Sequence, residues 1–186
     1  LTLLDVASGA GDIPISWVRR ARREGWTLQV TMTDTRTTAL EEQQRRARRD
    51  QVDILSLQHD CLQSPLPGGF DVVTSSLFFH HLDDHEVFCL LQSMQAASDG
   101  VLLLCDLERS RANLLLVRAA ASVVSRSPVV HHDSAASVRA AFTAQEFKRL
   151  AEEALVRPIR VSRAFPCRFI AFQDEVTVPE AVPAFA

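Results

Sequence analysis

Small and acidic residues follow five apolar runs of this 186-residue chain, one group after each run. They are Gly9 and Gly11, Asp34, Asp60, Ser75 and Ser76, and Asp106. A glycine turn between a strand and a helix lets a ligand approach the backbone closely. An acidic side chain after the next strand can accept hydrogen bonds from both hydroxyls of a ribose. The pattern therefore predicts a binding site for a nucleoside-containing ligand.

The apolar runs have the length and composition of buried strands. They lie at 1–6, 28–33, 52–57, 70–74, 101–105, 159–163 and 168–173. Helical patterns separate most of them, at about 13–24, 38–49, 84–97, 111–124 and 143–155. Strands without polar alternation, separated by helices, are typical of a parallel sheet covered on both faces. Ligands of such sheets bind beyond the carboxyl ends of the strands, which is where the polar residues fall.

The glycine turn favours one class of nucleoside ligand over another. Dinucleotide-binding folds carry the motif G-x-G-x-x-G, whose third glycine permits close packing of a helix on a strand. In this chain Gly9 and Gly11 are followed by Pro14 at the third position. An NAD-linked oxidoreductase that binds a pyrophosphate here is therefore the disfavoured interpretation.

The longer string around the glycines is more specific. Residues 4–12, LDVASGAGD, resemble motif I of class I S-adenosylmethionine-dependent methyltransferases, an acidic residue followed by G-x-G-x-G. Asp34, the triplet 59–61 and the segment 70–82 resemble later motifs of that family. Ala7 and Asp12 are similar to the ubiquinone/menaquinone methyltransferase branch. The resemblance implies a Rossmann-like α/β fold, with a seven-stranded, mostly parallel sheet, helices on both faces and an antiparallel last strand.

The resemblance also implies a set of residues that bind S-adenosylmethionine, with S-adenosylhomocysteine as the product. The set is Asp5, Ala7, Ser8, Gly9, Gly11, Asp12, Asp34, Thr35, Asp60, Cys61, Ser75 and Ser76. Asp5 would order the glycine loop, and Asp12 would hold the amino group of the methionine part. Asp34 would bind the ribose hydroxyls, and Asp60 would bind the adenine with Cys61 beside the ring.

Methyl transfer depends on alignment more than on acid–base chemistry, and positioning can supply up to about 7–11 kcal/mol of catalysis. Ser75 and Ser76 are expected to line the cleft between cofactor and acceptor. A base is needed only when the acceptor arrives protonated. His80 and His81 are the candidate catalytic residues, because imidazole titrates near neutrality. The alternative is that these adjacent histidines have a structural role.

No metal ion is expected. His81 and His85 have the i, i+4 spacing of neighbours on a helix, and the triplet 131–133 (HHD) forms a second cluster. A metal site needs at least three converging ligands, and nothing in the sequence brings the two clusters together.

The overall composition bounds the remaining classes. A net charge of −3 gives no global attraction to nucleic acid or to an anionic membrane. Four scattered cysteines without a CxxC pair predict free thiols in a reducing, cytoplasmic compartment. The longest apolar stretch, 114–124, is interrupted by Arg118 and is too short to span a membrane. We expect one domain over 1–175 and a loosely held tail over 176–186.

Two segments leave other functions open. Arginines at 19–23 and 45–49 could form a basic face for RNA, although a solvated helix surface is favoured. The segment 114–117 (LLLV) is expected to cap an apolar acceptor pocket, to pack as core, or to form a homodimer interface. We predict methyl transfer to oxygen or carbon of an apolar or aromatic small molecule. An RNA methyltransferase and a non-catalytic, cofactor-binding regulator are the alternatives.

Overall fold

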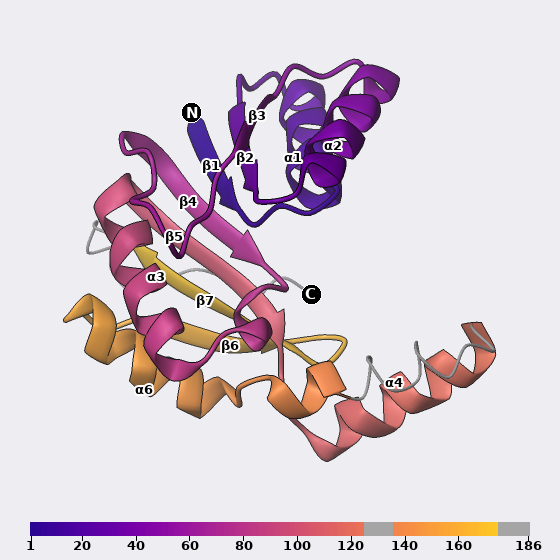
Figure 1. The fold of residues 1–186 in the computed structure, drawn as a ribbon, viewed down its shortest axis with the longest axis vertical. Coiled ribbons are helices and arrows are strands. Elements are labelled where there is room, and N and C mark those ends of the chain that lie inside the picture. The colour runs from indigo at the N-terminus through magenta and orange to yellow at the C-terminus, as the bar shows by residue number, and fades with distance from the viewer. Residues whose placement is uncertain (125–135, 175–186) are drawn as a thin grey trace.

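The computed structural model describes residues 1–124 and 136–174, which contain one seven-stranded sheet. The strand order is β3-β2-β1-β4-β5-β7-β6 (Figure 1). The strands are β1 (Thr2–Val6), β2 (Gln29–Asp34), β3 (Leu55–Gln58), β4 (Phe70–Ser76), β5 (Ser98–Leu107), β6 (Arg160–Ala164) and β7 (Arg168–Asp174). Strands β1 to β5 are parallel, whereas β7 runs antiparallel to both β5 and β6. The predicted Rossmann-like sheet with an antiparallel last strand is confirmed.

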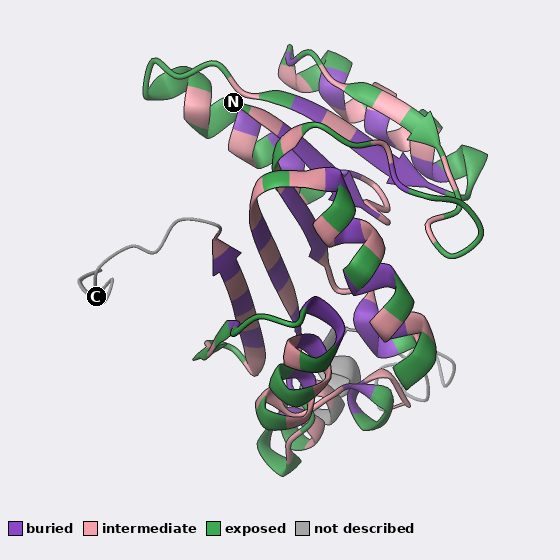
Figure 2. Ribbon diagram, turned by 90° about the vertical axis from the view of Figure 1, so that its left-hand side faces the viewer, coloured by how far each residue is buried: buried purple, intermediate pink, exposed green. Residues whose placement is uncertain are grey.

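Helices cover both faces of this sheet. They are α1 (Asp12–Arg23), α2 (Thr37–Asp50), α3 (Asp84–Ala97), α4 (Arg111–Val124) and α6 (Ala144–Leu155), with a 3-10 turn η1 (Phe79–His81). Side chains alternate along a strand, so neighbouring residues of β1 enter different cores. Leu3 packs with residues of α1 and α2, whereas Leu4 and Val6 join the larger core with α3 and α6. Figure 2 shows the buried strands beneath helices whose outer faces are exposed.

Capping boxes begin two helices where the sequence predicts them. Asp83 Oδ1 accepts a hydrogen bond from the backbone N–H of Glu86 at 2.8 Å, and Glu86 Oε2 accepts one from the backbone N–H of Asp83 at 2.9 Å. Thr143 and Glu146 form the same reciprocal pair at the start of α6. Each box satisfies N–H groups that a helix end leaves unpaired, which fixes the first residues of α3 and α6.

Two strands differ from the prediction by three residues at one end. The third begins at Leu55 instead of Val52, because Gln51, directly after α2, has a left-handed backbone and the following Val52 packs into the smaller core. The fifth extends beyond 101–105 in both directions, since it is hydrogen-bonded to β4 on one side and to β7 on the other. A strand between two partners is held along its whole length, so pairing lengthens it beyond its apolar centre.

Helix α4 extends away from the sheet (Figure 1). Its Leu115 and Leu116 are 67% and 48% exposed, so the core-packing interpretation is wrong for these two side chains. The predicted histidine cluster at 131–133 and the predicted tail at 176–186 lie outside the described residues. Among the helices that the structure describes, none is long and apolar enough to cross a membrane.

Candidate active site

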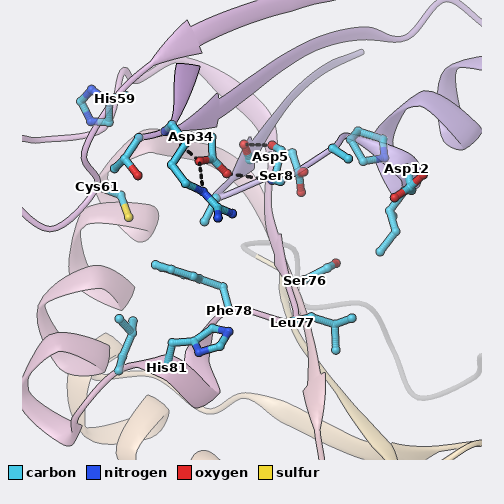
Figure 3. A pocket seen from close by; sticks show the side chains of 18 of the residues that line it. Asp5, Ser8, Asp12, Asp34, His59, Cys61, Ser76, Leu77, Phe78 and His81 are labelled. Atoms are coloured by element: carbon cyan, nitrogen blue, oxygen red, sulfur yellow. Dashed lines mark hydrogen bonds and ion pairs between the residues drawn. The ribbon is translucent and has the colours of Figure 1, made fainter. Parts of the chain in front are cut away.

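A cavity of about 780 Å³ lies beyond the carboxyl ends of β1, β2, β3 and β4. Most residues of the predicted cofactor set line it, namely Asp5, Ala7, Ser8, Gly9, Asp12, Asp34, Thr35, Asp60, Cys61 and Ser76. In Figure 3, Asp5, Asp34 and Cys61 lie along one side of the cavity, and Phe78 and His81 face them from the other. Parallel strands deliver their polar ends to one edge of the sheet, which is why residues far apart in the sequence meet here.

The loop after β1 is a tight, hydrogen-bonded turn. Ser8 donates its backbone N–H to the carbonyl of Thr33 at 2.8 Å, and Gly11 donates to the carbonyl of Ser8 at 2.9 Å. Gly9 and Gly11 both have left-handed backbones, with φ of 53° and 75°. A Cβ at Gly11 would lie 2.9 Å from Met32 Sδ, whereas a Cβ at Gly9 would meet nothing within 4 Å. Gly9 therefore opens on the cavity, while Gly11, which does not line it, permits close packing against β2.

Ala7 stands where the resembled motif has its first glycine, and its backbone is also left-handed, with φ of 56°. This conformation costs a residue with a Cβ about 1–2 kcal/mol. Leu77, which follows β4, has the same strain, with φ of 58°, and both residues line the cavity. Backbone strain of this kind persists where the surrounding structure enforces it, and it concentrates at functional sites.

A buried glutamine of α2 holds the glycine loop from behind. Gln43 Nε2 donates to the carbonyl of Gly9 at 2.9 Å, and the Gln43 side chain is fully buried. The sequence prediction missed Gln43, because α2 is polar and nothing distinguishes Gln43 from the glutamine beside it. The available signal was its position four residues from both Ala39 and Ala47, which places all three on the buried face of the helix.

Asp34, the last residue of β2, connects the glycine loop to the second strand. Its Oδ2 accepts a hydrogen bond from the backbone N–H of Gly9 at 2.9 Å, and its Oδ1 accepts one from the backbone N–H of Arg36 at 3.0 Å (Figure 3). The Arg36 guanidinium lies 3.8 Å from the same Oδ1. Each carboxylate oxygen offers two acceptor positions, so Asp34 can accept further hydrogen bonds from a ligand.

Asp5 is a buried carboxyl group near the end of β1. Burial raises the pKa of Asp5 to about 7, and a hydrogen bond from Ser8 opposes the shift. Its Oδ1 is buried and has no hydrogen-bond partner among the described residues. The backbone carbonyl of Asp5 accepts a hydrogen bond from Ser8 Oγ at 2.8 Å. Asp5 thus orders the loop through its backbone, and one of its carboxyl oxygens remains available.

Asp60 and Cys61 lie on the loop that follows β3. Asp60 Oδ1 accepts a hydrogen bond from the backbone N–H of Leu62 at 3.0 Å, which stabilises the turn. Burial, together with the charge of Asp60, raises the pKa of the Cys61 thiol to about 11. Cys61 is therefore a neutral thiol at physiological pH, suited to packing against a ligand and not to nucleophilic attack.

Asp12 and Thr35 lie at the rim of the cavity. Asp12 begins α1, is largely exposed, and forms an ion pair with Arg46 of α2. In Figure 3 it lies well apart from Asp34 and Asp5. The predicted role of Asp12 in holding an amino group would therefore require its carboxylate to be shared with Arg46.

The two serines at the end of β4 face different surroundings. Ser76 lines the cavity, but Ser75 does not. Ser75 is fully buried, and its hydroxyl donates to the carbonyl of Val6 at 2.9 Å, across to β1. The expectation that both serines line the cleft is therefore corrected, because consecutive side chains of a strand point to opposite faces.

The two histidines of η1 also differ. His80 is buried and does not line the cavity, and its Nδ1 lies 2.7 Å from Asp106 Oδ1. Its placement corrects the expectation that it acts on a ligand in this cleft. His81 does line the cavity, and its ring centroid lies 4.0 Å from that of His80. Burial and the neighbouring His80 lower the pKa of His81, and Asp106 opposes this shift.

The rest of the cavity wall is formed by residues that the sequence prediction missed. Leu77, Phe78 and Leu82 supply apolar surface after β4, and Arg168 reaches the cavity from β7. For Leu77, Phe78 and Leu82 the signal was their position between Ser76 and the predicted helix at 84–97. Nothing local marks Arg168, because only the antiparallel pairing of β7 with β5 brings it to this edge.

The described residues include no group of three His, Cys, Asp or Glu side chains that could hold a metal ion. His85, one member of the predicted pair with His81, lies 3.8 Å from the Cys89 sulfur instead.

The comparison of sequences agrees with this geometry. Residues 3–98, just over half of the chain, match the profile of a family described as methyltransferase domain. The chain belongs to the methyltransferase domain family. No curated protein sequence matches this methyltransferase domain significantly.

Solved structures share the fold of this methyltransferase domain at low sequence identity. An S-adenosylmethionine-dependent methyltransferase from Aquifex aeolicus has a TM-score of 0.65 at 17% identity, over 95% of this chain and 82% of its own. Magnesium protoporphyrin IX methyltransferase from Synechocystis, solved with bound SAH (S-adenosylhomocysteine), has a TM-score of 0.64 at 14% identity, over 94% and 73%. An O-methyltransferase family 2 protein from Planctomyces limnophilus, in complex with apigenin, has a TM-score of 0.65 at 16% identity, over 94% and 50%. The methyltransferase domain spans about half the length of several such proteins.

Proposed function

We propose that this methyltransferase domain binds S-adenosylmethionine in the cavity and transfers its methyl group to oxygen or carbon of an apolar small molecule. The observation that carries the proposal is the hydrogen bond from the Gly9 N–H to Asp34. It joins the glycine loop after β1 to the acid that ends β2. These are the two features that would bind the methionine part and the ribose of the cofactor. The match of residues 3–98 to the methyltransferase family supports the same proposal.

The residues present fit this cofactor. The open space beside Gly9 allows a ligand to approach the loop backbone. Asp34 has spare acceptor positions for ribose hydroxyls. The unpartnered Oδ1 of Asp5 offers a buried polar atom, which costs about 1–3 kcal/mol while it stays unsatisfied. We assign Asp60 and Cys61 to the adenine end, because they lie on the far side of Asp34 from the glycine loop.

When bound, the cofactor would supply an electrophilic methyl group on a sulfonium sulfur, which leaves with the electron pair of the broken C–S bond as the acceptor gains the methyl group. The protein has to align the acceptor and take its proton. We assign the proton to His81, whose lowered pKa keeps the imidazole neutral and able to accept it. His80 and Asp106 act behind it as positioning residues, since their hydrogen bond fixes the first turn after β4.

The acceptor is proposed to be aromatic or otherwise apolar, because Leu77, Phe78 and Leu82 form the wall opposite the cofactor residues. The related Planctomyces protein was solved with apigenin, which is an acceptor-sized aromatic compound. The four cysteines are all free, which suits a reducing compartment, and we place the protein in the cytoplasm on that ground. The exposed Leu115 and Leu116 are the surface on which a homodimer would form.

The experiment that tests the function is calorimetric titration with S-adenosylhomocysteine, with NADH as the parallel ligand. Wild type should bind S-adenosylhomocysteine saturably. Asp34→Ala should weaken the binding at least about tenfold, because the charge-assisted hydrogen bonds of the carboxylate to the two ribose hydroxyls would be lost. Thr38→Ala, on the exposed start of α2, is the control that should leave affinity unchanged. NADH binding in place of S-adenosylhomocysteine would overturn the proposal.

An RNA methyltransferase is the weaker candidate. Five of the eight arginines in the two predicted basic runs form ion pairs with acids on or directly after α1 and α2: Arg19, Arg20, Arg45, Arg46 and Arg49. Pairing neutralises the charge that phosphate would need to meet. A non-catalytic regulator would bind S-adenosylhomocysteine and yet show no turnover with any acceptor.

A further inference from the structure

Arg168 lines the cavity but has no role yet in binding the cofactor or in taking the proton of the acceptor. It is the first residue of β7. Strands β1, β4, β5 and β7 lie side by side in that order. Neighbouring strands are about 4.8 Å apart, so β7 lies roughly 14 Å across the sheet from β1. Arg168 pairs with Leu107, which lies four residues beyond Leu103, the residue of β5 that is level with Asp5. This position places Arg168 beyond the glycine loop, at the acceptor end of the cavity.

The guanidinium of Arg168 has no carboxylate partner within the residues that the structure describes. Arg36, the other arginine of the cavity, lies beside Asp34. Asp106, the acid on the adjacent strand, pairs in register with Phe169, so its side chain lies on the other face of the sheet from Arg168, where its Oδ1 lies 2.7 Å from His80 Nδ1. The positive charge of Arg168 is therefore not neutralised by an acid on its own sheet.

Arg168 does contact a thiol. Burial raises the pKa of Cys105, and the charge and hydrogen bond of Arg168 oppose that shift. A thiol is a weak and neutral partner, so it orients the guanidinium without neutralising it. The contact holds the side chain in place along β5, facing the same cavity as Phe78 and Leu82.

We propose that Arg168 binds an anionic group, a carboxylate, on the methyl acceptor, whose apolar body packs against Phe78 and Leu82. The inference rests on the proposed methyltransferase function and narrows its substrate class from apolar molecules to apolar acids. A planar guanidinium presents paired N–H donors that match a carboxylate, and such charge-assisted pairs are stronger than neutral hydrogen bonds. An apolar wall beside a cation that no described carboxylate neutralises selects a ligand with the complementary pattern.

The test uses two matched probes on protein saturated with S-adenosylhomocysteine: 1-hydroxy-2-naphthoate and its neutral analogue 1-hydroxy-2-naphthamide. Calorimetry should give a Kd for the naphthoate at least about tenfold below that of the amide, as expected for a hydrogen bond to a charged group. Arg168→Gln should remove this preference by weakening only the naphthoate. Arg168→Lys keeps the positive charge but loses the paired N–H donors of the guanidinium, so it should retain part of the preference for the naphthoate.

Two controls separate this inference from its foundation. Arg160→Gln alters an arginine on neighbouring β6 that pairs with Asp174 outside the cavity, and it should leave both probes unchanged. S-adenosylhomocysteine should bind every variant with the wild-type Kd, which also shows that each variant is folded. Three results would overturn the role of Arg168 alone. They are equal affinity of wild type for the naphthoate and the amide, no binding of the naphthoate to wild type, or an equal loss of affinity for both probes in Arg168→Gln. Failure of wild type to bind S-adenosylhomocysteine would instead overturn the proposed function.

Discussion

Alanine substitutions at the two loop glycines should have opposite consequences. Gly9 and Gly11 both have left-handed backbones, so each alanine carries about 1–2 kcal/mol of backbone strain. About 0.5–1 kcal/mol of this is offset, because glycine loses more conformational freedom on folding than alanine does. The backbone contribution is therefore similar at the two positions, and it leaves roughly 1 kcal/mol of destabilisation or less.

Only Gly11→Ala adds a steric cost. Its Cβ would lie 2.9 Å from Met32 Sδ and 3.2 Å from Gln43 Cγ. Both side chains are fully buried, so neither can move into solvent to make room. Overpacking of this kind costs about 1–3 kcal/mol. We expect Gly11→Ala to lower the free energy of unfolding by about 1–4 kcal/mol, and Gly9→Ala by about 1 kcal/mol or less.

Affinity should follow the reverse order. A Cβ at Gly9 projects into open space of the cavity, where it would meet the bound ligand, whereas Gly11 does not line the cavity. Urea denaturation followed by circular dichroism gives the stabilities, and calorimetry with S-adenosylhomocysteine gives the affinities. Gly9→Ala should bind more weakly than a folded sample of Gly11→Ala. Equal losses of stability in the two variants would refute the steric reasoning, and wild-type affinity in Gly9→Ala would refute the assigned ligand position.

Two further predictions concern titration. Asp5 has its pKa raised from 3.8 to about 7, so its contribution to stability is full below pH 4 and is lost as the pH rises through 7. Asp5→Asn should therefore be more stable than wild type above pH 7, by up to about 4 kcal/mol, with the gap closing toward pH 4 in urea titrations; a gap independent of pH would contradict it. An NMR titration of His81 should show a midpoint below 6.5, because burial and His80 disfavour the charged imidazole. A midpoint above that value would show that the charge of Asp106 dominates instead.

The strands were predictable because a parallel sheet buried on both faces requires continuous apolar runs. Leu3, Leu4 and Val6 are all buried although they face different cores, so no polar alternation interrupts the run. The glycine loop and Asp34 were predictable for a related reason. Their residue types are dictated by a backbone turn and by the end of a strand, which are local features of the sequence.

The remaining features of the cavity depend on the three-dimensional arrangement. Whether Ser75 or Ser76 faces the cavity is set by the register of β4 against β1. Whether His80 or His81 is buried is set by Asp106, which lies 26 residues away on β5. Arg168 enters the cavity only through an antiparallel pairing that no local pattern announces. Helix ends and turns depend on residues close by in the sequence, whereas the neighbours of a side chain depend on how all the strands of the sheet are paired.

The position of β7 has a consequence for the order in which the protein is synthesised. It is the last described strand along the chain, yet it lies between β5 and β6. Until residues 168–174 emerge from the ribosome, β5 keeps an unpaired edge and β6 has no partner in the sheet. Unpaired edges attract strands of other chains, so the growing polypeptide passes through an aggregation-prone stage. The glycine loop can form early in translation, whereas the end of the cleft that holds Arg168 is completed only when β7 is inserted.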